Sequence, residues 1–153
     1  MAALDFNQDL VTIINEPLTC TEVESRLADV PTQQGYVKDS YKQAILDREA
    51  LFPTGLYVGT FNAAIPHCDS VNVNKGAMCL GVLKQPVSWA LMEDTSKTCN
   101  VSLVVMLAIT DPKDHLTMLR KGVGFIQDQE RVGRVVASED PAQIYALVTD
   151  KLA

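Results

Sequence analysis

The segment Val101–Ile109 constrains the fold of this chain more than any other feature of the sequence, because Ser102 is its only polar residue. A strand can be apolar on both faces only where other elements cover both sides of its sheet. Segments with helical periodicity stand before and after this run. We therefore predict a central strand at 101–109 and a layered α/β sandwich with helices packed on the sheet.

Further strands and helices are expected along the chain. The strands are bounded by glycine and proline and fall at Leu56–Val58, Asn62–Ile65, Ala77–Leu83 and Val87–Trp89. The helices follow apolar residues at helical spacing, and they fall at about 20–30, 39–51, 112–126, 129–137 and 141–152. We expect Pro31 to stop the first helix. No repeat or linker is visible, so residues 1–153 are expected to form a single domain.

Three helix signals are specific enough to test individually. Thr19 and Glu22 have the spacing of a capping box at the start of the first helix. Asp111 is expected to cap the helix that follows the central strand, with Pro112 at its first position. Gly122 and Gly124 lie inside that helix and should each weaken it by about 1 kcal/mol.

Charge and composition narrow the class of protein. The 153 residues carry 13 Lys and Arg against 19 Asp and Glu, a formal net charge of −6. Clustered basic residues are missing, so we do not expect nucleic acid as a partner. No run approaches the roughly 18 apolar residues of a membrane span, and Met1–Asp5 lacks the basic and apolar regions of a signal peptide. Four cysteines without a Cys-x-x-Cys motif argue against a disulfide framework. The expectation is a soluble, cytoplasmic protein that does not insert into a membrane.

The chain has only two histidines, and both stand where α/β folds bind ligands. His67 follows a strand that ends at Pro66, and His115 falls in the first turn of the helix after the central strand. If the two strands are parallel neighbours, both imidazoles reach the same edge of the sheet. A helix N-terminus disfavours the imidazolium, so His115 should stay neutral. The alternative is that His67 is an ordinary loop residue and His115 an ordinary helix-start residue.

Arg48 is a basic residue on an otherwise apolar helix stripe formed with Tyr41, Ala44 and Ile45. A charge that faces inward needs an anionic partner or a route to solvent. Arg48 therefore either binds an anionic ligand or extends to solvent beside an aspartate such as Asp47 or Asp69.

Other candidate chemistry is weaker. Cys68 adjoins His67 and could be a thiol nucleophile or half of a metal pair, but adjacent side chains in an extended segment point in opposite directions. No set of three or four residues has the spacing of metal ligands, so we expect neither a metal nor a cofactor. Thr54 could add a hydroxyl to a site, although a turn with Gly55 at positive φ explains the pair better. No paired carboxylates can be placed from the sequence.

Three elements resemble the signature of enzyme IIA domains of the fructose–mannitol–galactitol type, from the bacterial phosphoenolpyruvate-dependent sugar phosphotransferase system (PTS). They occur in the family's order, as Arg-Glu-Ala-Leu-Phe-Pro-Thr-Gly (48–55), Ala-Ala-Ile-Pro-His (63–67) and Asp-His-Leu-x-x-Leu (114–119). The resemblance extends over about residues 5–150 and is nearest to the galactitol branch. It implies an α/β (α+β) three-layer sandwich, with helices on both faces of a mixed sheet of about five strands.

The resemblance also implies an activity, that of a phosphotransferase. His67 corresponds to the phosphorylated histidine, His115 to the second active-site histidine, which hydrogen-bonds the phosphoryl group, and Arg48 to the arginine that stabilises its charge. The phosphoryl group would come from the histidine phosphocarrier protein (HPr) and pass to a cysteine of a cognate IIB component, with the membrane component IIC downstream, during uptake of a galactitol-like sugar. Leu56, Phe61 and Val71 could contribute to the docking face.

Two alternatives stay open at this point. A regulatory IIA-like protein would keep His67 and signal through phosphorylation-dependent protein binding. A Cys68-dependent thiol hydrolase or transferase would use the neighbouring residue instead.

Overall fold

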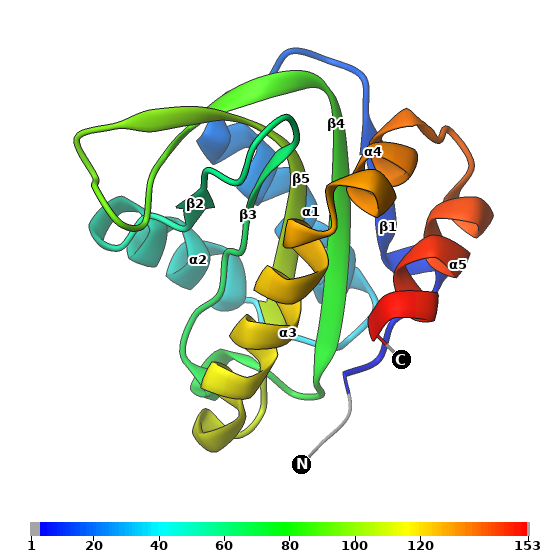
Figure 1. Ribbon diagram of the computed structural model, residues 1–153. Helices are drawn as coiled ribbons and strands as arrows, with labels where there is room; N and C mark the ends of the chain where they lie inside the picture. Colours follow the sequence, from blue (N-terminus) through cyan, green and yellow to red (C-terminus); the bar gives the residue numbers. More distant parts are fainter. Residues whose placement is uncertain (1–3, 153) are drawn as a thin grey trace.

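The computed structural model describes residues 4–152 and contains a five-stranded mixed sheet (Figure 1). The strand order is β1-β4-β5-β3-β2. Parallel pairs are β1·β4 and β3·β5, and antiparallel pairs are β2·β3 and β4·β5. The strands are β1 (Val11–Ile14), β2 (Gly55–Leu56), β3 (Asn62–Ala64), β4 (Ala77–Ala90) and β5 (Thr98–Ala108).

Helices cover both faces of this sheet, as Figure 1 shows for α3 in front of it and α1 behind it. Residues of α1 and α2 pack in the core on one face, and residues of α3, α4 and α5 pack in the core on the other. The predicted three-layer sandwich is therefore confirmed. The helices are α1 (Cys20–Gln33), α2 (Tyr41–Leu51), α3 (His115–Gln127), α4 (Gln129–Ala137) and α5 (Pro141–Leu152), with 3-10 turns at Gln8–Leu10, Ser70–Asn72 and Pro112–Asp114.

The middle strand is the apolar segment recognised in the sequence. Val104 and Met106 of β5 face the core under α1 and α2, whereas Val105 and Leu107 face the core under α3, α4 and α5. This alternation explains the continuous apolar run, because each face of a central strand is buried.

Several element boundaries differ from the sequence predictions. The two strands expected at 77–83 and 87–89 form one strand, β4, with a register irregularity between Val82 and Val87. The four-residue strand β1 was not predicted, because four residues carry too little periodicity to identify a strand. The helix expected from 112 begins as a 3-10 turn at Pro112, capped by Asp111, and becomes α-helical at His115.

The prediction that Pro31 stops α1 was wrong, since the helix continues to Gln33. Pro31 lies in the last turn, where the loss of one N–H donor is tolerated. The helix then ends two residues later in a Schellman-type turn, with Gly35 at φ 82° and the N–H of Tyr36 donating to the carbonyl of Pro31 at 3.0 Å. At the other end of α1, the capping box of Thr19 and Glu22 is present as predicted.

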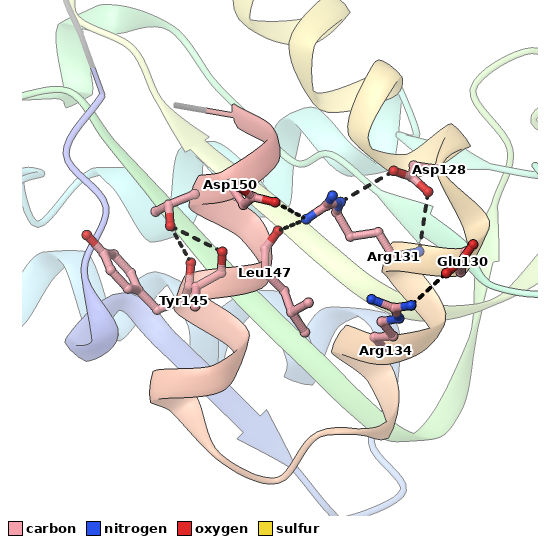
Figure 2. A network of polar contacts seen from close by, with 9 residues as sticks. Asp128, Glu130, Arg131, Arg134, Tyr145, Leu147 and Asp150 are labelled. Atoms are coloured by element: carbon pink, nitrogen blue, oxygen red, sulfur yellow. Dashed lines mark hydrogen bonds and ion pairs between the residues drawn. The ribbon is translucent and has the colours of Figure 1, made fainter.

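Arg131 ties the last two helices together (Figure 2). Its Nη1 donates to the carbonyl of Leu147 at 2.9 Å and to Asp150 at 3.2 Å, and its Nε donates to Asp128 at 3.4 Å. The Arg131 side chain is partly buried, and the two bonds from its Nη1 hold α5 against α4, whereas the bond to Asp128 stays at the start of α4. Within residues 4–152, no helix has the length and apolar character needed to cross a membrane.

Candidate functional site

The two histidines meet at one edge of the sheet. Their ring centroids are 5.8 Å apart, and the ring planes make an angle of 67°. His67 follows β3 and His115 follows β5, and these strands are parallel neighbours. The sequence predicted that both imidazoles reach the same edge of the sheet if their strands are parallel neighbours. The strands are parallel neighbours, and the imidazoles meet.

The backbone around His67 determines how its ring is held. Its Nδ1 lies 2.9 Å from the carbonyl oxygen of Ile65. A carbonyl only accepts hydrogen bonds, so Nδ1 carries the hydrogen and the lone pair of the neutral ring is on Nε2. The N–H of Leu107 donates to the carbonyl of Pro66 at 3.0 Å, which ties this segment to the end of β5. In this arrangement Nδ1 is engaged with the backbone and the lone pair of the neutral ring is on Nε2.

The electrostatic surroundings favour neutral imidazoles. Burial, with smaller contributions from the charges of Arg48 and His115, lowers the pKa of His67 below 6.5, against the effects of the Ile65 hydrogen bond and Asp69. Burial and the Arg48 charge likewise lower the pKa of His115. The pKa of His115 is shifted in the direction predicted from its place at a helix start, and burial and the Arg48 charge cause the shift. Both rings are thus mostly uncharged at neutral pH.

Ser70 is a site residue that the sequence analysis missed. Its Oγ lies 3.4 Å from Nε2 of His115, a contact that orients the second imidazole. No sequence motif marks this serine. Its part in the site depends on the 3-10 turn 70–72, which brings it back towards the start of α3.

Arg48 faces the site with unused hydrogen-bonding capacity. It lies in the last turn of α2, its Nε is buried without a hydrogen-bond partner, and its guanidinium carbon is 5.5 Å from the centre of the Phe52 ring. Among the described side chains it makes no ion pair, so the aspartate pairing considered from the sequence does not form. A partly buried guanidinium with an unpartnered N–H and no anion beside it is suited to bind an anion.

An open hollow of about 270 Å³ lies beside Arg48, lined also by Phe52, Cys68 and Asp69. The two imidazoles do not line this hollow, although Cys68 directly follows His67 in the chain. The hollow is a concave surface between the end of α2 and residues 68–72, next to the cationic side chain.

Cys68 is poorly suited to act as a nucleophile. Its side chain is buried in the core under α1 and α2, and burial raises the pKa of its thiol to about 11. A thiol with this pKa is almost fully protonated at neutral pH, whereas the thiolate is the reactive form. Among the residues that the structure describes, no three His, Cys, Asp or Glu side chains cluster as a metal site.

Thr54 is held by Glu49. Its hydroxyl donates to Oε1 of Glu49 at 2.7 Å and its N–H donates to Oε2 at 2.6 Å. The expected positive φ at Gly55 was wrong, since Gly35 and Gly59 are the positive-φ residues of the described chain. Gly55 is required for another reason: a Cβ there would collide with the backbone carbonyl of Ala90.

A pair of carboxyl groups was also missed. Glu24 of α1 and Glu49 of α2 are both buried where these helices pack on one another, and the charge of Glu49 contributes to raising the pKa of Glu24. Glu24 and Glu49 lie on different helices, so no periodic pattern in the sequence connects them. Only the packing of α1 on α2 brings the pair to light.

The apolar surface near the site differs in part from the expected one. Val71 is exposed, but Leu56 and Phe61 are only partly exposed and pack against the core under α3 and α4. Other large apolar side chains are exposed close to the site residues, namely Leu51 and Phe52 after Arg48 and Leu116 after His115.

Comparisons with known proteins match most of the chain. The family model "Phosphoenolpyruvate-dependent sugar phosphotransferase system, EIIA 2" matches residues 6–151. The "PTS system galactitol-specific EIIA component" of Escherichia coli K12 is 30% identical over 116 residues, which cover 76% of this chain and 77% of that protein.

Solved structures show the same fold. The enzyme IIAMTL structure, from its complex with phosphorylated enzyme IIBMTL of Escherichia coli, matches with a TM-score of 0.80 at 20% identity, over 97% of this chain and 99% of that chain. Nitrogen regulatory protein IIA-Ntr of Neisseria meningitidis matches with a TM-score of 0.70 at 15% identity, over 93% and 94% of the two chains. From the family match and the galactitol-specific relative, this chain belongs to the EIIA 2 family of the phosphoenolpyruvate-dependent sugar phosphotransferase system, whose members are phosphotransfer components.

Proposed function

We propose that this chain accepts a phosphoryl group on Nε2 of His67 and passes it to a cysteine of a IIB component. The observation that carries the proposal is the hydrogen bond from Nδ1 of His67 to the Ile65 carbonyl, because it leaves Nε2 free. The lowered pKa of His67 supports the same role, since only the neutral imidazole has a lone pair to donate.

In the first transfer, the lone pair of Nε2 attacks the phosphorus of a phosphohistidine on HPr. The bond between phosphorus and the donor nitrogen breaks, and its electron pair returns to the donor imidazole. No proton has to leave His67, because its hydrogen is on Nδ1. The phosphorylated ring then carries a positive charge, which the Ile65 carbonyl stabilises. In the second transfer, a thiolate of the IIB component attacks phosphorus and the electron pair of the N–P bond returns to Nε2.

Catalysis of both steps depends on positioning and charge. The transferred group is loose and highly charged in the transition state. The guanidinium of Arg48, which has no anionic partner among the described residues, would bind the phosphoryl oxygens, and His115 would donate a hydrogen bond to them. No metal or cofactor has a part in this scheme.

The proposed partners follow from the family. The galactitol-specific relative supports uptake of a galactitol-like sugar, and the complex of enzyme IIAMTL with phosphorylated enzyme IIBMTL supports a IIB component as the acceptor. The donor would be HPr, the sugar would be handled downstream by IIB and membrane IIC, and the relay would operate in the cytoplasm. Leu51, Phe52, Val71 and Leu116 are exposed apolar side chains beside the site and would contact these proteins.

The decisive experiment is a reconstituted relay of phosphoenolpyruvate, enzyme I, HPr and this chain. We expect one acid-labile, base-stable phosphoryl group per chain, absent from His67→Ala. The His115→Ala variant should still be labelled but should transfer onward more slowly, because the group that it loses binds the phosphoryl oxygens. Undiminished labelling of His67→Ala would refute the proposal.

The regulatory alternative differs in the fate of the phosphoryl group. The likeness to the nitrogen regulatory protein concerns the fold alone, whereas the 30% identical relative is a sugar-specific component. We therefore favour transport. When a purified galactitol-type IIB component is added to the phosphorylated chain, the chain should lose its phosphoryl group within the turnover time of the relay. A phosphoryl group that persists on the chain would favour the regulatory role.

A further inference from the structure

Two buried carboxyl groups, one on α1 and one on α2, lie close enough to interact where these helices pack on one another. The residue Glu24 is 1% exposed and Glu49 is 8% exposed. Neither forms an ion pair with a Lys or Arg among the described side chains. Two ionised carboxylates in this position would repel one another without a cation to compensate them. The pair therefore needs a proton.

The surroundings of Glu49 are those of an ionised carboxylate. Its Oε2 accepts hydrogen bonds from the backbone N–H of Thr54 at 2.6 Å and from Nε1 of Trp89 at 3.0 Å, and its Oε1 accepts one from the Thr54 hydroxyl at 2.7 Å. These three donors come from two different segments, the turn after α2 and strand β4. They satisfy the charged form of Glu49.

The surroundings of Glu24 are those of a neutral acid. Its Oε2 is buried without a hydrogen-bond partner, and its Oε1 has only the Cys20 thiol at 3.9 Å. The other titratable group facing it is Tyr41 of α2, whose hydroxyl donates to the Leu107 carbonyl and not to Glu24. Burial and the negative charge of Glu49 raise the pKa of Glu24 to about 10. A proton on Glu24 converts its contact with Glu49 into a hydrogen bond.

We propose that Glu24 and Glu49 share one proton, held on Glu24, and that this carboxyl dyad is a positioning device for Arg48 and His67. Glu49 accepts hydrogen bonds from the turn after α2 and holds that turn in place. Glu24 donates a further hydrogen bond to Glu49.

The dyad reaches His67 through the backbone. Glu49 binds Thr54, the carbonyl of Thr54 accepts the N–H of Ile65 at 3.3 Å, and the carbonyl of Ile65 binds Nδ1 of His67. The same carboxylate is adjacent in sequence to Arg48, in the last turn of α2. Displacement of Glu49 would therefore disturb both the ring orientation of His67 and the approach of Arg48. This kinetic consequence rests on the proposed phosphoryl transfer, whereas the shared proton does not.

The shared proton can be tested without any activity. Carbon-13 labelling of glutamate side chains allows each carboxyl group to be titrated by NMR. We expect one glutamate to stay protonated at neutral pH and to titrate well above the usual range, and its signal should vanish in Glu24→Gln. In Glu49→Gln the neighbouring negative charge is removed, so Glu24 should titrate at lower pH. If every glutamate of the wild type titrates in the usual acidic range, the dyad is refuted.

The positioning role needs a readout that a general loss of structure would not mimic. Nitrogen-15 shifts of the His67 ring report its tautomer, and we expect the Nδ1–H form in the wild type. Glu24→Ala should mix the tautomers and slow phosphoryl acceptance by about tenfold. Glu24→Gln, which keeps a donor towards Glu49, should restore both. Glu93→Gln removes an exposed carboxylate and serves as the matched control.

The pH profile gives a further check that does not depend on folding of the alanine variant. At each pH, the rate of phosphoryl acceptance by the wild type is divided by the rate for Glu24→Gln, so that the pH dependence of the donor proteins cancels. This ratio should decline as the pH approaches 10, because only the wild type loses the shared proton. A ratio that stays constant, together with a wild-type tautomer in Glu24→Ala, would overturn the positioning role. If the wild type itself is never phosphorylated, the proposed function fails while the NMR titration still tests the dyad.

Discussion

The rings of His67 and His115 meet edge to face, with their centroids 5.8 Å apart. They reach this position from the ends of two parallel strands, β3 and β5, of which the second is the middle strand of the sheet. Arg48 comes to the same edge from the end of α2, a separate element. The site therefore combines, from three segments, two neutral imidazoles and an arginine that makes no ion pair with the side chains described in residues 4–152.

Replacement of Arg48 by alanine should slow phosphoryl acceptance by about a hundredfold, because one strong donor to the transferring group is lost. Arg48→Lys should recover part of this rate, since an ammonium supplies charge without the bidentate geometry. Rapid-quench measurement of labelled chain gives both rates. The free energy of unfolding should change little in either variant, because the Nε of Arg48 has no hydrogen-bond partner among the described residues and only the contact with the exposed Phe52 ring is lost. A wild-type transfer rate in Arg48→Ala would contradict the assigned role.

The lowered pKa of His67 predicts how transfer depends on pH. The unfolded chain takes up this proton near pH 6.5, but the folded chain takes it up only at lower pH. Acceptance should therefore stay constant as the pH falls through 6.5 and decline only below it. By the same linkage, the free energy of unfolding should decrease as the pH falls from 6.5 towards the folded pKa. Titration of the His67 ring protons by NMR, with His115→Ala to assign them, provides the check. An inflection at or above 6.5 would contradict the prediction.

Substitution of Gly124 should stabilise the fold. It is an exposed position inside α3, and a Cβ there would meet no atom within 4 Å. Gly124→Ala should raise the free energy of unfolding by about 1 kcal/mol. Gly81→Ala is the matched contrast, because its Cβ would lie 2.6 Å from Cδ1 of the buried Leu27. That variant should lose about 1–3 kcal/mol through overpacking. Urea denaturation measures both, and a destabilised Gly124→Ala would contradict the open space at that position.

The raised pKa of Glu24 predicts a stability that falls as the pH rises. Between the ordinary value of 4.5 and about 10, the folded chain holds a proton that the unfolded chain has released. The free energy of unfolding should therefore decrease with pH in this range, by up to about 1.4 kcal/mol per unit from this group. Glu24→Gln carries no such proton. Denaturation curves between pH 6 and 9 should diverge for the two proteins, with the variant becoming relatively more stable. Parallel curves would show that Glu24 is ionised in the fold.

Much of the architecture could be predicted from local patterns. The helices α4 and α5 occupy the predicted ranges, the apolar segment is the middle strand, and Thr19 with Glu22 forms the predicted cap. Each of these depends on residues within a few positions of one another, so the sequence carries the necessary information. Helix boundaries were harder to predict where two local preferences oppose one another. At Pro31, the favourable helix end at Gly35 outweighs the one hydrogen bond that proline removes.

The contacts within the candidate site could not be predicted from local sequence patterns. Position relative to strand ends drew attention to His67 and His115, and an apolar helix stripe drew attention to Arg48. The resemblance to enzyme IIA domains then selected these three residues from the alternatives. Whether the two imidazoles meet depended on β3 and β5 being parallel neighbours, and strand order is decided by the packing of the whole chain. The isolation of Arg48 and the pairing of Glu24 with Glu49 depend on tertiary structure in the same way. The sequence by itself determined the chemical groups and the elements that carry them. Only the tertiary structure decided which groups touch, because those contacts join segments far apart in the chain.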